Sequence, residues 1–92
     1  MQRILNVHPS LLPLHKGKMD LDVHREVLAM RESESGCSVH VVTAQVDAGP
    51  VVVQKRCAVL PDDSPEVLKA RVQALEGPAL IQAVRCFHVL HH

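Results

Sequence analysis

The sequence predicts an α/β fold in which helices cover a small sheet. Apolar runs of strand type and stretches of helical period follow one another in the order strand, helix, strand, strand, helix, which is typical of a layered α/β architecture. Hydrophobic residues make up 47% of the chain, yet Phe87 is its single aromatic residue. Aliphatic side chains must therefore build the core, and such side chains suit a sheet packed against helices.

The bulk composition restricts the class of protein. A chain of 92 residues is at most one domain. Its ten basic and ten acidic residues give a formal net charge of zero, without runs of like charge, which argues against a general nucleic-acid-binding surface. Its three cysteines are widely spaced, and neither a secretory signal nor an apolar stretch of the roughly 20 residues that cross a bilayer is recognisable. We therefore expect a cytoplasmic protein without nucleic-acid or membrane partners; an organelle-targeting segment lost with a missing N-terminus stays an alternative.

The chain opens with a predicted strand and a long loop. Residues 4–7 form a short apolar run that ends before Pro9, because proline has no amide hydrogen to donate to a ladder. Such a run indicates a buried parallel strand. Residues 9–18 hold two prolines and a glycine without a steady period, so we expect a loop. The strand begins almost at Met1 and needs neighbours that the chain does not obviously contain, which predicts a truncated domain.

A first helix is expected over residues 23–30, where apolar side chains recur on one face. Asp20 or Asp22 is a suitable cap for its first turn. Gly36 is predicted to mark the end of this helix.

Two strands and a turn follow the first helix. Residues 37–46 and 51–60 are rich in β-branched side chains, which favours strands. Between them, residues 47–50 have the composition of a turn. The sequence therefore predicts a hairpin or a sharp reversal.

The last predicted element is a helix that starts at Pro65. Ser64 offers a hydroxyl as the cap, and proline is favoured at the first helical position. Gly77 and Pro78 are expected to kink this helix or to divide it in two.

Asn6 and His8 are the first candidates for chemistry. They are separated by two positions, so on a strand their side chains project from the same face, roughly 6 to 7 Å apart. They also lie at the C-terminal end of the predicted strand, where open α/β sheets place active sites. The alternative is structural: Asn6 caps the loop and His8 bonds a carbonyl group.

Three blocks of sequence resemble a known family. They are Asn6-Val7-His8-Pro9-Ser10-Leu11-Leu12-Pro13, Gly36-Cys37-Ser38-Val39-His40 and Val46-Asp47-Ala48-Gly49-Pro50-Val51-Val52-Val53-Gln54. In this order the blocks are similar to the folate-dependent formyltransferases, and most similar to the phosphoribosylglycinamide (glycinamide ribonucleotide) formyltransferases among them. The resemblance implies that residues 1–92 are the C-terminal part of a formyltransferase catalytic domain. It implies a partial Rossmann-like sheet with flanking helices, whose N-terminal strands are missing.

The resemblance also implies a reaction. A formyl group passes from 10-formyltetrahydrofolate, the co-substrate, to the amine of glycinamide ribonucleotide in de novo purine biosynthesis, without a metal. Asn6, as an amide donor, and His8, as an imidazolium, are then expected to hold the oxyanion of the tetrahedral intermediate. Asp47 is expected to pair with His8 and keep it charged, because a nearby carboxylate favours protonated histidine. It is also expected to position a water that relays the proton.

Ligand-binding residues are implied in the same way. Substrate contacts are expected from Ser38, His40, Gln73 and Glu76, and folate contacts from His40 and Asp47. Because Ser38 and His40 alternate with valines on a predicted strand, a half-buried structural role is an alternative for both. Glu76 is alternatively a solvated helix residue, and Gln73 has the weaker claim.

Two further segments contain histidines. The family's counterpart of residues 14–19 is a mobile flap over the folate, and His15, Lys16 and Lys18 give it a positive character, so we expect mobility here. The histidines within residues 88–92 share one helical face, a spacing that suits a metal. Frayed terminal histidines that complement the helix dipole are the preferred interpretation.

More than one function is compatible with these residues. The family's first half supplies a Gly-Ser-Asn loop that grips the substrate phosphate, and this chain has no glycine-rich loop leading into a helix. The chain is thus either part of an enzyme that acts in a longer polypeptide or with a complementary N-terminal half, or a non-catalytic, folate-binding remnant. The family also includes formyltetrahydrofolate hydrolases and methionyl-tRNA formyltransferases, and a relative of either enzyme stays a possible interpretation.

Overall fold

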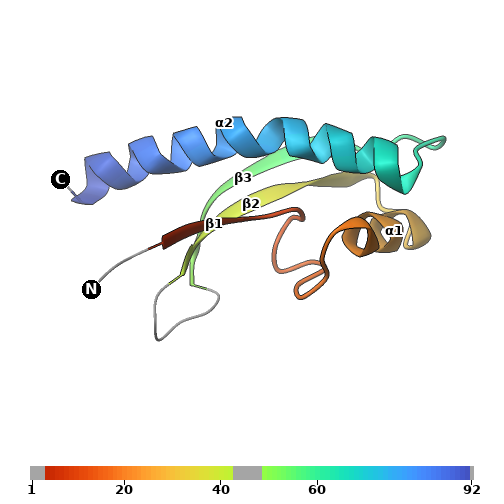
Figure 1. The fold of residues 1–92 in the computed structure, drawn as a ribbon, viewed down its shortest axis with the longest axis horizontal. Coiled ribbons are helices and arrows are strands. Elements are labelled where there is room, and N and C mark those ends of the chain that lie inside the picture. Colours follow the sequence, from red (N-terminus) through yellow and green to blue (C-terminus); the bar gives the residue numbers. More distant parts are fainter. Residues whose placement is uncertain (1–3, 43–48, 92) are drawn as a thin grey trace.

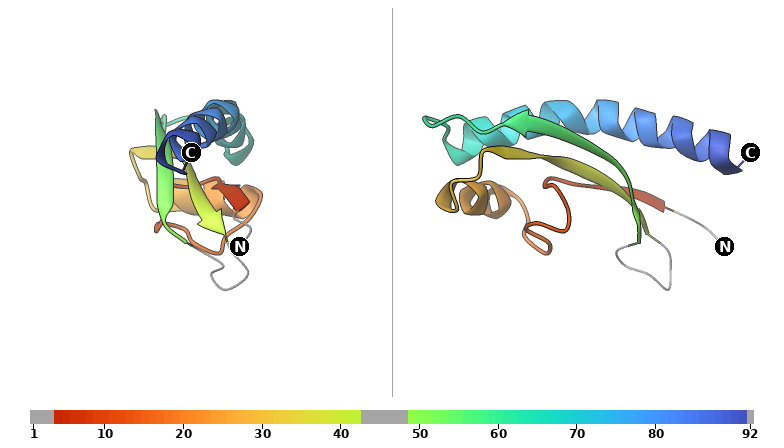
Figure 2. Two further views of the ribbon diagram at one scale, coloured as in Figure 1. Left: turned by 90° about the vertical axis from the view of Figure 1, so that its left-hand side faces the viewer. Right: turned by 180° about the vertical axis from the view of Figure 1, so that it is seen from behind.

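The computed structural model describes residues 4–42 and 49–91, with their side chains up to Cys86. The elements are β1 (Ile4–His8), α1 (Leu21–Ala29), β2 (Glu34–Val42), β3 (Val51–Ala58) and α2 (Pro65–His91). Their order is the predicted one. The helix α2 lies along one face of the sheet, and the loop between β1 and α1 lies on the opposite side (Figures 1 and 2).

The three strands form one antiparallel sheet in the order β1-β2-β3. The antiparallel pairing of β2 with β3 confirms the predicted reversal, although Asp47 and Ala48 of the expected turn lie outside the described residues. The expectation of a buried parallel strand at β1 is wrong within the described sheet, because β1 pairs antiparallel with β2 and Ile4 is 59% exposed. An apolar run reports which side chains avoid water but carries no information on the direction of the neighbouring strand.

The helix α2 begins where the sequence predicts. The Oγ of Ser64 accepts a hydrogen bond from the Val67 amide (3.2 Å), as a capping residue does. The helix then continues through Pro78, so the predicted division does not occur. Gly77 and Pro78 are exposed, where water can satisfy the carbonyl that loses its amide partner, and Ala79 and later residues pack on the sheet.

Gly36 has a different role from the predicted one. It lies inside β2, and the chain leaves α1 instead through Arg31, whose φ of 53° is left-handed. A Cβ atom at Gly36 would lie 1.9 Å from the Lys55 carbonyl oxygen and 2.9 Å from Leu11 Cδ2. Close strand packing therefore requires this glycine. At the start of α1, Asp20 occupies the capping position, but its side chain makes no capping hydrogen bond.

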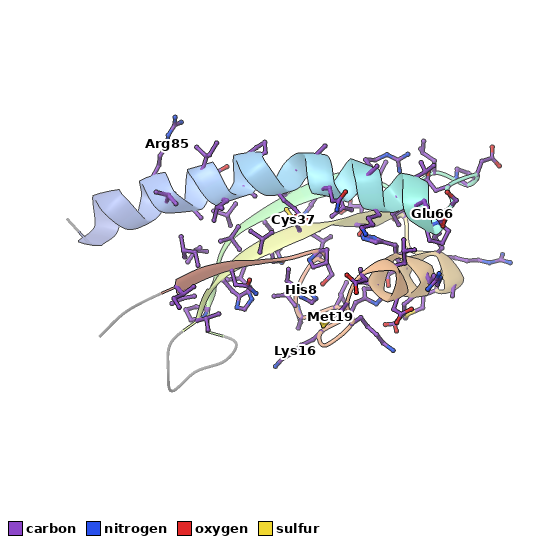
Figure 3. All side chains as sticks on the ribbon, in the orientation of Figure 1. His8, Lys16, Met19, Cys37, Glu66 and Arg85 are labelled. Atoms are coloured by element: carbon purple, nitrogen blue, oxygen red, sulfur yellow. The ribbon has the colours of Figure 1, made fainter. Side chains whose placement is uncertain are left out.

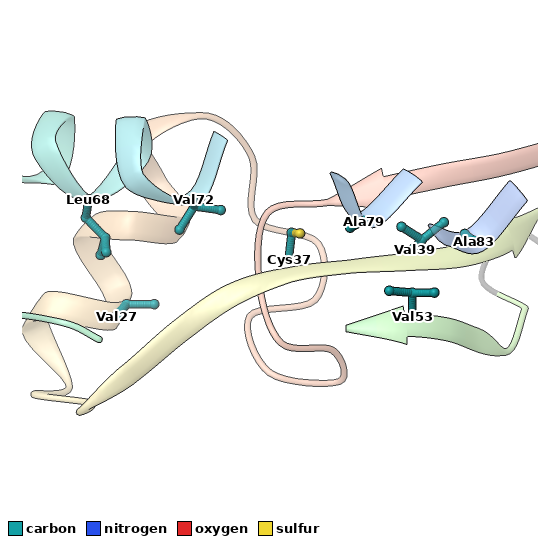
Figure 4. Packing of buried hydrophobic residues seen from close by; sticks show 8 residues of the cluster. All are labelled: Val27, Cys37, Val39, Val53, Leu68, Val72, Ala79 and Ala83. Carbon is teal, nitrogen blue, oxygen red and sulfur yellow. The ribbon is translucent and has the colours of Figure 1, made fainter. Parts of the chain in front are cut away.

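The core lies between α2, α1 and one face of the sheet (Figure 4). It consists of aliphatic side chains, one thiol and two alanines of the long helix, namely Val27, Cys37, Val39, Val53, Leu68, Val72, Ala79 and Ala83. The opposite face of the sheet carries the polar side chains of β1 and β2. None of the helices in the described ranges is both long and apolar enough to cross a membrane.

Candidate functional site

A cavity of about 620 Å³ lies between the ends of the strands and the loop that follows β1. Its lining combines polar strand residues with the loop that follows β1: Asn6, His8, Leu12, Pro13, Lys16, Gly17, Lys18, Met19, His40, Gly49 and Val51. In Figure 3, His8 lies on the same side of the sheet as Lys16 and Met19, whereas Cys37 lies between the sheet and α2. The alternation of strand residues thus places Asn6, His8 and His40 on the cavity side of the sheet and the valines between them on the core side.

Asn6 and His40 face each other across β1 and β2 on the cavity wall. They are register partners, and the Asn6 Nδ2 amide donates to His40 Nε2 at 3.2 Å. The hydrogen of a neutral His40 ring is then on Nδ1, which is buried and has no hydrogen-bond partner in the described part of the chain. The second amide hydrogen of Asn6 stays available to a ligand. An amide donor and an imidazole therefore meet at the cavity, but the imidazole that Asn6 contacts belongs to His40 and not to His8, which sequence reasoning placed beside it.

His8 lies two residues further along the strand, half-buried at the end of β1. Its Nε2 is 3.4 Å from the backbone carbonyl oxygen of His15, a long contact in which only the ring can donate. The structural alternative for His8 is therefore realised, while the ring also lines the cavity. Burial lowers the pKa of His8 below its usual value of 6.5, the His15 carbonyl opposes this effect, and the nearby His40 and His15 rings lower the pKa further.

These surroundings favour the neutral form of His8. No carboxylate in the described residues is hydrogen-bonded to its ring. Asp47, which was expected to supply that carboxylate, lies outside the described residues. The described residues thus contain no carboxylate that would favour the protonated His8 ring, which the resemblance implies through Asp47.

Ser38 is fully buried and does not line the cavity. Its Oγ donates to the Ser10 carbonyl (2.8 Å) and accepts from the Leu12 amide (3.0 Å) and from Gln54 Nε2 (3.1 Å). Gln54 also donates to the Leu12 carbonyl (2.9 Å). Sequence reasoning placed Gln54 in a family block without giving it a role, and the structure shows that Ser38 and Gln54 together hold the loop against the sheet.

Gln73 and Glu76 lie on α2, the layer on the other side of the sheet from the cavity (Figures 1 and 2). Gln73 is exposed and Glu76 is half-buried, and burial raises the pKa of the Glu76 carboxyl against the effect of Lys69. The structure does not bring these two side chains together with Asn6 and His8. Their neighbour Arg71 is bound structurally: it pairs with Asp63 (2.8 Å), which lowers the pKa of that carboxyl to about 2.

The centre of the loop after β1 is held by ion pairs, so the basic side chains expected there are partly paired with carboxylates. His15 is buried between the carboxylates of Glu26 and Glu32, and Lys18 lies 3.4 Å from Glu26. Sequence reasoning missed Glu26 and Glu32 because they are 11 and 17 positions from His15. Among the described side chains, no three potential metal ligands cluster, and the histidines of residues 88–92 lie beyond those side chains.

Comparisons with known proteins identify the family of the chain. Residues 1–84 match the family model described as formyl transferase, so the chain belongs to the formyl transferase family. Among its relatives, the phosphoribosylglycinamide formyltransferase of Escherichia coli is 46% identical over 74 residues, which are 80% of this chain and 34% of that protein. The trifunctional purine biosynthetic protein adenosine-3 of Drosophila melanogaster is 42% identical over 82 residues, 89% of this chain and 6% of the relative.

A solved structure extends the likeness to three dimensions. The glycinamide ribonucleotide transformylase 1 of Symbiobacterium toebii superposes with a TM-score of 0.78 at 42% identity, covering 90% of this chain and 38% of the other. The chain thus spans little more than a third of the length of such single-function relatives.

Proposed function

We propose that this chain supplies the formyl-polarising part of an enzyme that transfers a formyl group from 10-formyltetrahydrofolate to the amine of glycinamide ribonucleotide in purine biosynthesis. The observation that carries the proposal is the meeting of the Asn6 amide with the imidazoles of His8 and His40 on one cavity wall, since these residues come from two of the sequence blocks that resemble the family. The names of the relatives support glycinamide ribonucleotide as the acceptor.

The chemistry follows from the charge that develops during transfer. Attack by the amine on the formyl carbon forms a C–N bond and moves an electron pair onto the formyl oxygen. The free hydrogen of the Asn6 amide and a protonated His8 ring then stabilise this oxygen. Loss of the amine proton and breakage of the bond to the folate nitrogen complete the transfer. A free amine with a pKa near 8 needs little activation, so polarising the formyl group is the larger task.

Asp47 has the decisive role in the protonation of His8. The described surroundings lower the pKa of His8, and a carboxylate within reach acts in the opposite direction. We propose that Asp47 supplies that carboxylate and positions the water that carries the proton from the amine to the folate nitrogen. Asp47 and His40 are proposed to contact the folate, and no step requires a metal.

The other expected site residues are proposed to have different roles. His40 is proposed to contact substrate through the edge of its ring on the cavity wall, because Nδ1 is buried and Nε2 accepts from Asn6. Ser38 is proposed to act through the loop, since its hydroxyl already has three protein partners. Gln73 and Glu76 are proposed to meet substrate in the assembled enzyme, and burial keeps a larger share of Glu76 protonated.

This chain is proposed to be the C-terminal catalytic part of the enzyme. The remaining two thirds are proposed to come either from a longer polypeptide that includes this chain or from a complementary N-terminal half. The missing portion would grip the substrate phosphate. Positioning supplies much of the rate in such transfers, so the chain alone is expected to bind folate and to turn over little or nothing.

Folate binding by the chain tests the proposal directly. The chain has neither tryptophan nor tyrosine, so the fluorescence of a non-hydrolysable 10-formyl folate analogue is read without protein background. We expect saturable binding that Asn6→Ala weakens at least tenfold. Gln82→Ala, which removes an exposed amide from α2, is the matched control and is expected to bind as the unmodified chain does.

A complementation assay separates transfer from hydrolysis. The chain is mixed with the N-terminal portion of a relative, and formylated product and free formate are both measured with and without glycinamide ribonucleotide. Formylated product that requires the amine supports the proposal. Formate release without the amine identifies a hydrolase, and binding without either product identifies a non-catalytic remnant.

A further inference from the structure

We propose that His15, held between Glu26 and Glu32, is a positioning residue that fixes the hydrogen-bonding direction of the His8 ring. The three residues His15, Glu26 and Glu32 are called the His15 clamp below. The inference rests on the proposed function, because it concerns the histidine to which that function assigns the formyl oxygen. It adds residues from α1 and from the turn after α1 to the machinery of the cavity.

The geometry of the clamp places a carboxylate oxygen at each nitrogen of the His15 ring. Nδ1 lies 2.5 Å from Glu26 Oε1 and Nε2 lies 2.6 Å from Glu32 Oε1. Carboxylates only accept hydrogen bonds, and an imidazole donates from both nitrogens only as the imidazolium. The His15 side chain is 3% exposed, whereas the side chains of Glu26 and Glu32 are 32% and 21% exposed, so the ring is buried and the carboxylates stay partly in water. Contact with His15 also lowers the pKa of the Glu26 carboxyl, which keeps this partner ionised.

The clamp holds the backbone of His15 in its observed conformation. His15 has a φ of 58°, in the left-handed region that side chains with a Cβ rarely adopt. Ring contacts on both sides hold the residue in this conformation. Its carbonyl oxygen consequently accepts from two donors, the Lys18 amide at 3.2 Å and His8 Nε2 at 3.4 Å.

The His15 carbonyl determines which nitrogen of the His8 ring carries the hydrogen. Because a carbonyl cannot donate, the hydrogen of neutral His8 lies on Nε2, and Nδ1 carries the lone pair. When His8 gains a proton, the new hydrogen is on Nδ1, the nitrogen that is free of the His15 carbonyl. The clamp thus selects which nitrogen gains and loses the proton during transfer.

The charged groups around His8 come from several elements. His40 of β2 and His15 of the loop act on its ring directly, and Lys16 and Lys18 line the same cavity. Glu26 and Glu32 reach His8 only through His15. A change at Glu32 therefore affects His8 mainly through the carbonyl and not through direct contact.

Nitrogen NMR of the histidine rings tests the inference on the full chain. With ¹⁵N-labelled histidine, spectra are recorded over a pH series from about 6 to 9, and wherever the His8 ring is neutral the separation of its two nitrogen signals reports which nitrogen bears the hydrogen. His8→Gln identifies the His8 signals by their loss. Glu32→Gln removes one side of the clamp, and Glu34→Gln is the matched control, because it makes the same change in a surface pair with Arg56 (3.1 Å).

We expect widely separated His8 nitrogen signals with the hydrogen on Nε2 in the unmodified chain and in Glu34→Gln. In Glu32→Gln the two signals should move towards each other as the hydrogen distributes over both nitrogens. Identical His8 signals in the unmodified chain and Glu32→Gln would overturn the inference, as would an equal change in Glu34→Gln. If Glu32→Gln unfolds at the measuring temperature, Glu26→Gln removes the other contact and is judged by the same outcomes.

The NMR measurement reports the His8 ring and does not depend on turnover. Absence of formyl transfer in the complementation assay would refute the proposed function and leave the His8 spectra unaffected. Unchanged spectra would refute the positioning role and leave the transfer assay unaffected. The two failures are thus distinguishable.

Discussion

Replacing Gly36 by alanine is expected to destabilise the fold strongly. The added Cβ would lie 1.9 Å from the Lys55 carbonyl oxygen, so β2 and β3 must separate to admit it. Overpacking usually costs about 1–3 kcal/mol, and here the obstacle is backbone that cannot rotate away. We therefore expect a loss of at least about 3 kcal/mol, which for a domain of this size lowers the melting temperature by roughly 12 °C or more.

Gly77→Ala is the matched comparison. This glycine lies on the exposed side of α2, and a Cβ there meets nothing within 4 Å. Alanine in a helix is favoured over glycine by about 0.5–1 kcal/mol, so this variant should melt a few degrees higher than the unmodified chain. Thermal melts followed by far-ultraviolet circular dichroism measure both variants. Equal melting temperatures for Gly36→Ala and the unmodified chain would refute the packing argument at β2.

Three other changes have definite expected outcomes. Ser38→Ala leaves the Leu12 amide without its acceptor, and we expect a loss of about 1–3 kcal/mol in urea unfolding and faster hydrogen exchange at Leu12; unchanged exchange there would contradict the role given to Ser38. Burial lowers the pKa of His24 in α1, and the nearby Lys69 lowers it further, so below pH 6.5 the unfolded chain binds a proton that the folded chain does not. Stability should consequently fall as the pH decreases from about 7 towards 5, by at most about 1.4 kcal/mol per pH unit from this histidine, and urea titrations that give a flat profile would argue against this. Asp47→Asn in the complemented enzyme should reduce turnover by roughly a hundredfold or more, and near-normal turnover would remove Asp47 from the mechanism.

Local signals in the sequence predicted the elements well. The Ser64–Pro65 start of α2 and the reversal between β2 and β3 depend on residues that are adjacent in the chain, and both are found. Polar residues at alternate positions also predicted that Asn6 and His8 share a face, and both line the cavity.

The failures concern contacts between distant residues. Gly36 was interpreted as a helix end because its clash with Lys55 is visible only once β3 lies beside it. The direction of β1, the burial of Ser38 and the charge partners of His15 likewise depend on residues more than ten positions away. Side-chain periodicity describes one element at a time, so it contains none of these relations.

The alternation along β2 places adjacent side chains on opposite faces of the sheet. Val39 is fully buried in the core, while His40 beside it belongs to the cavity wall. A slip of one position against β1 would exchange the two, placing an imidazole among the aliphatic side chains and a valine where the amide of Asn6 needs an acceptor. Any substitution that weakens the pairing of these strands therefore disturbs the core and the cavity wall at once, and neither can change while the other is preserved.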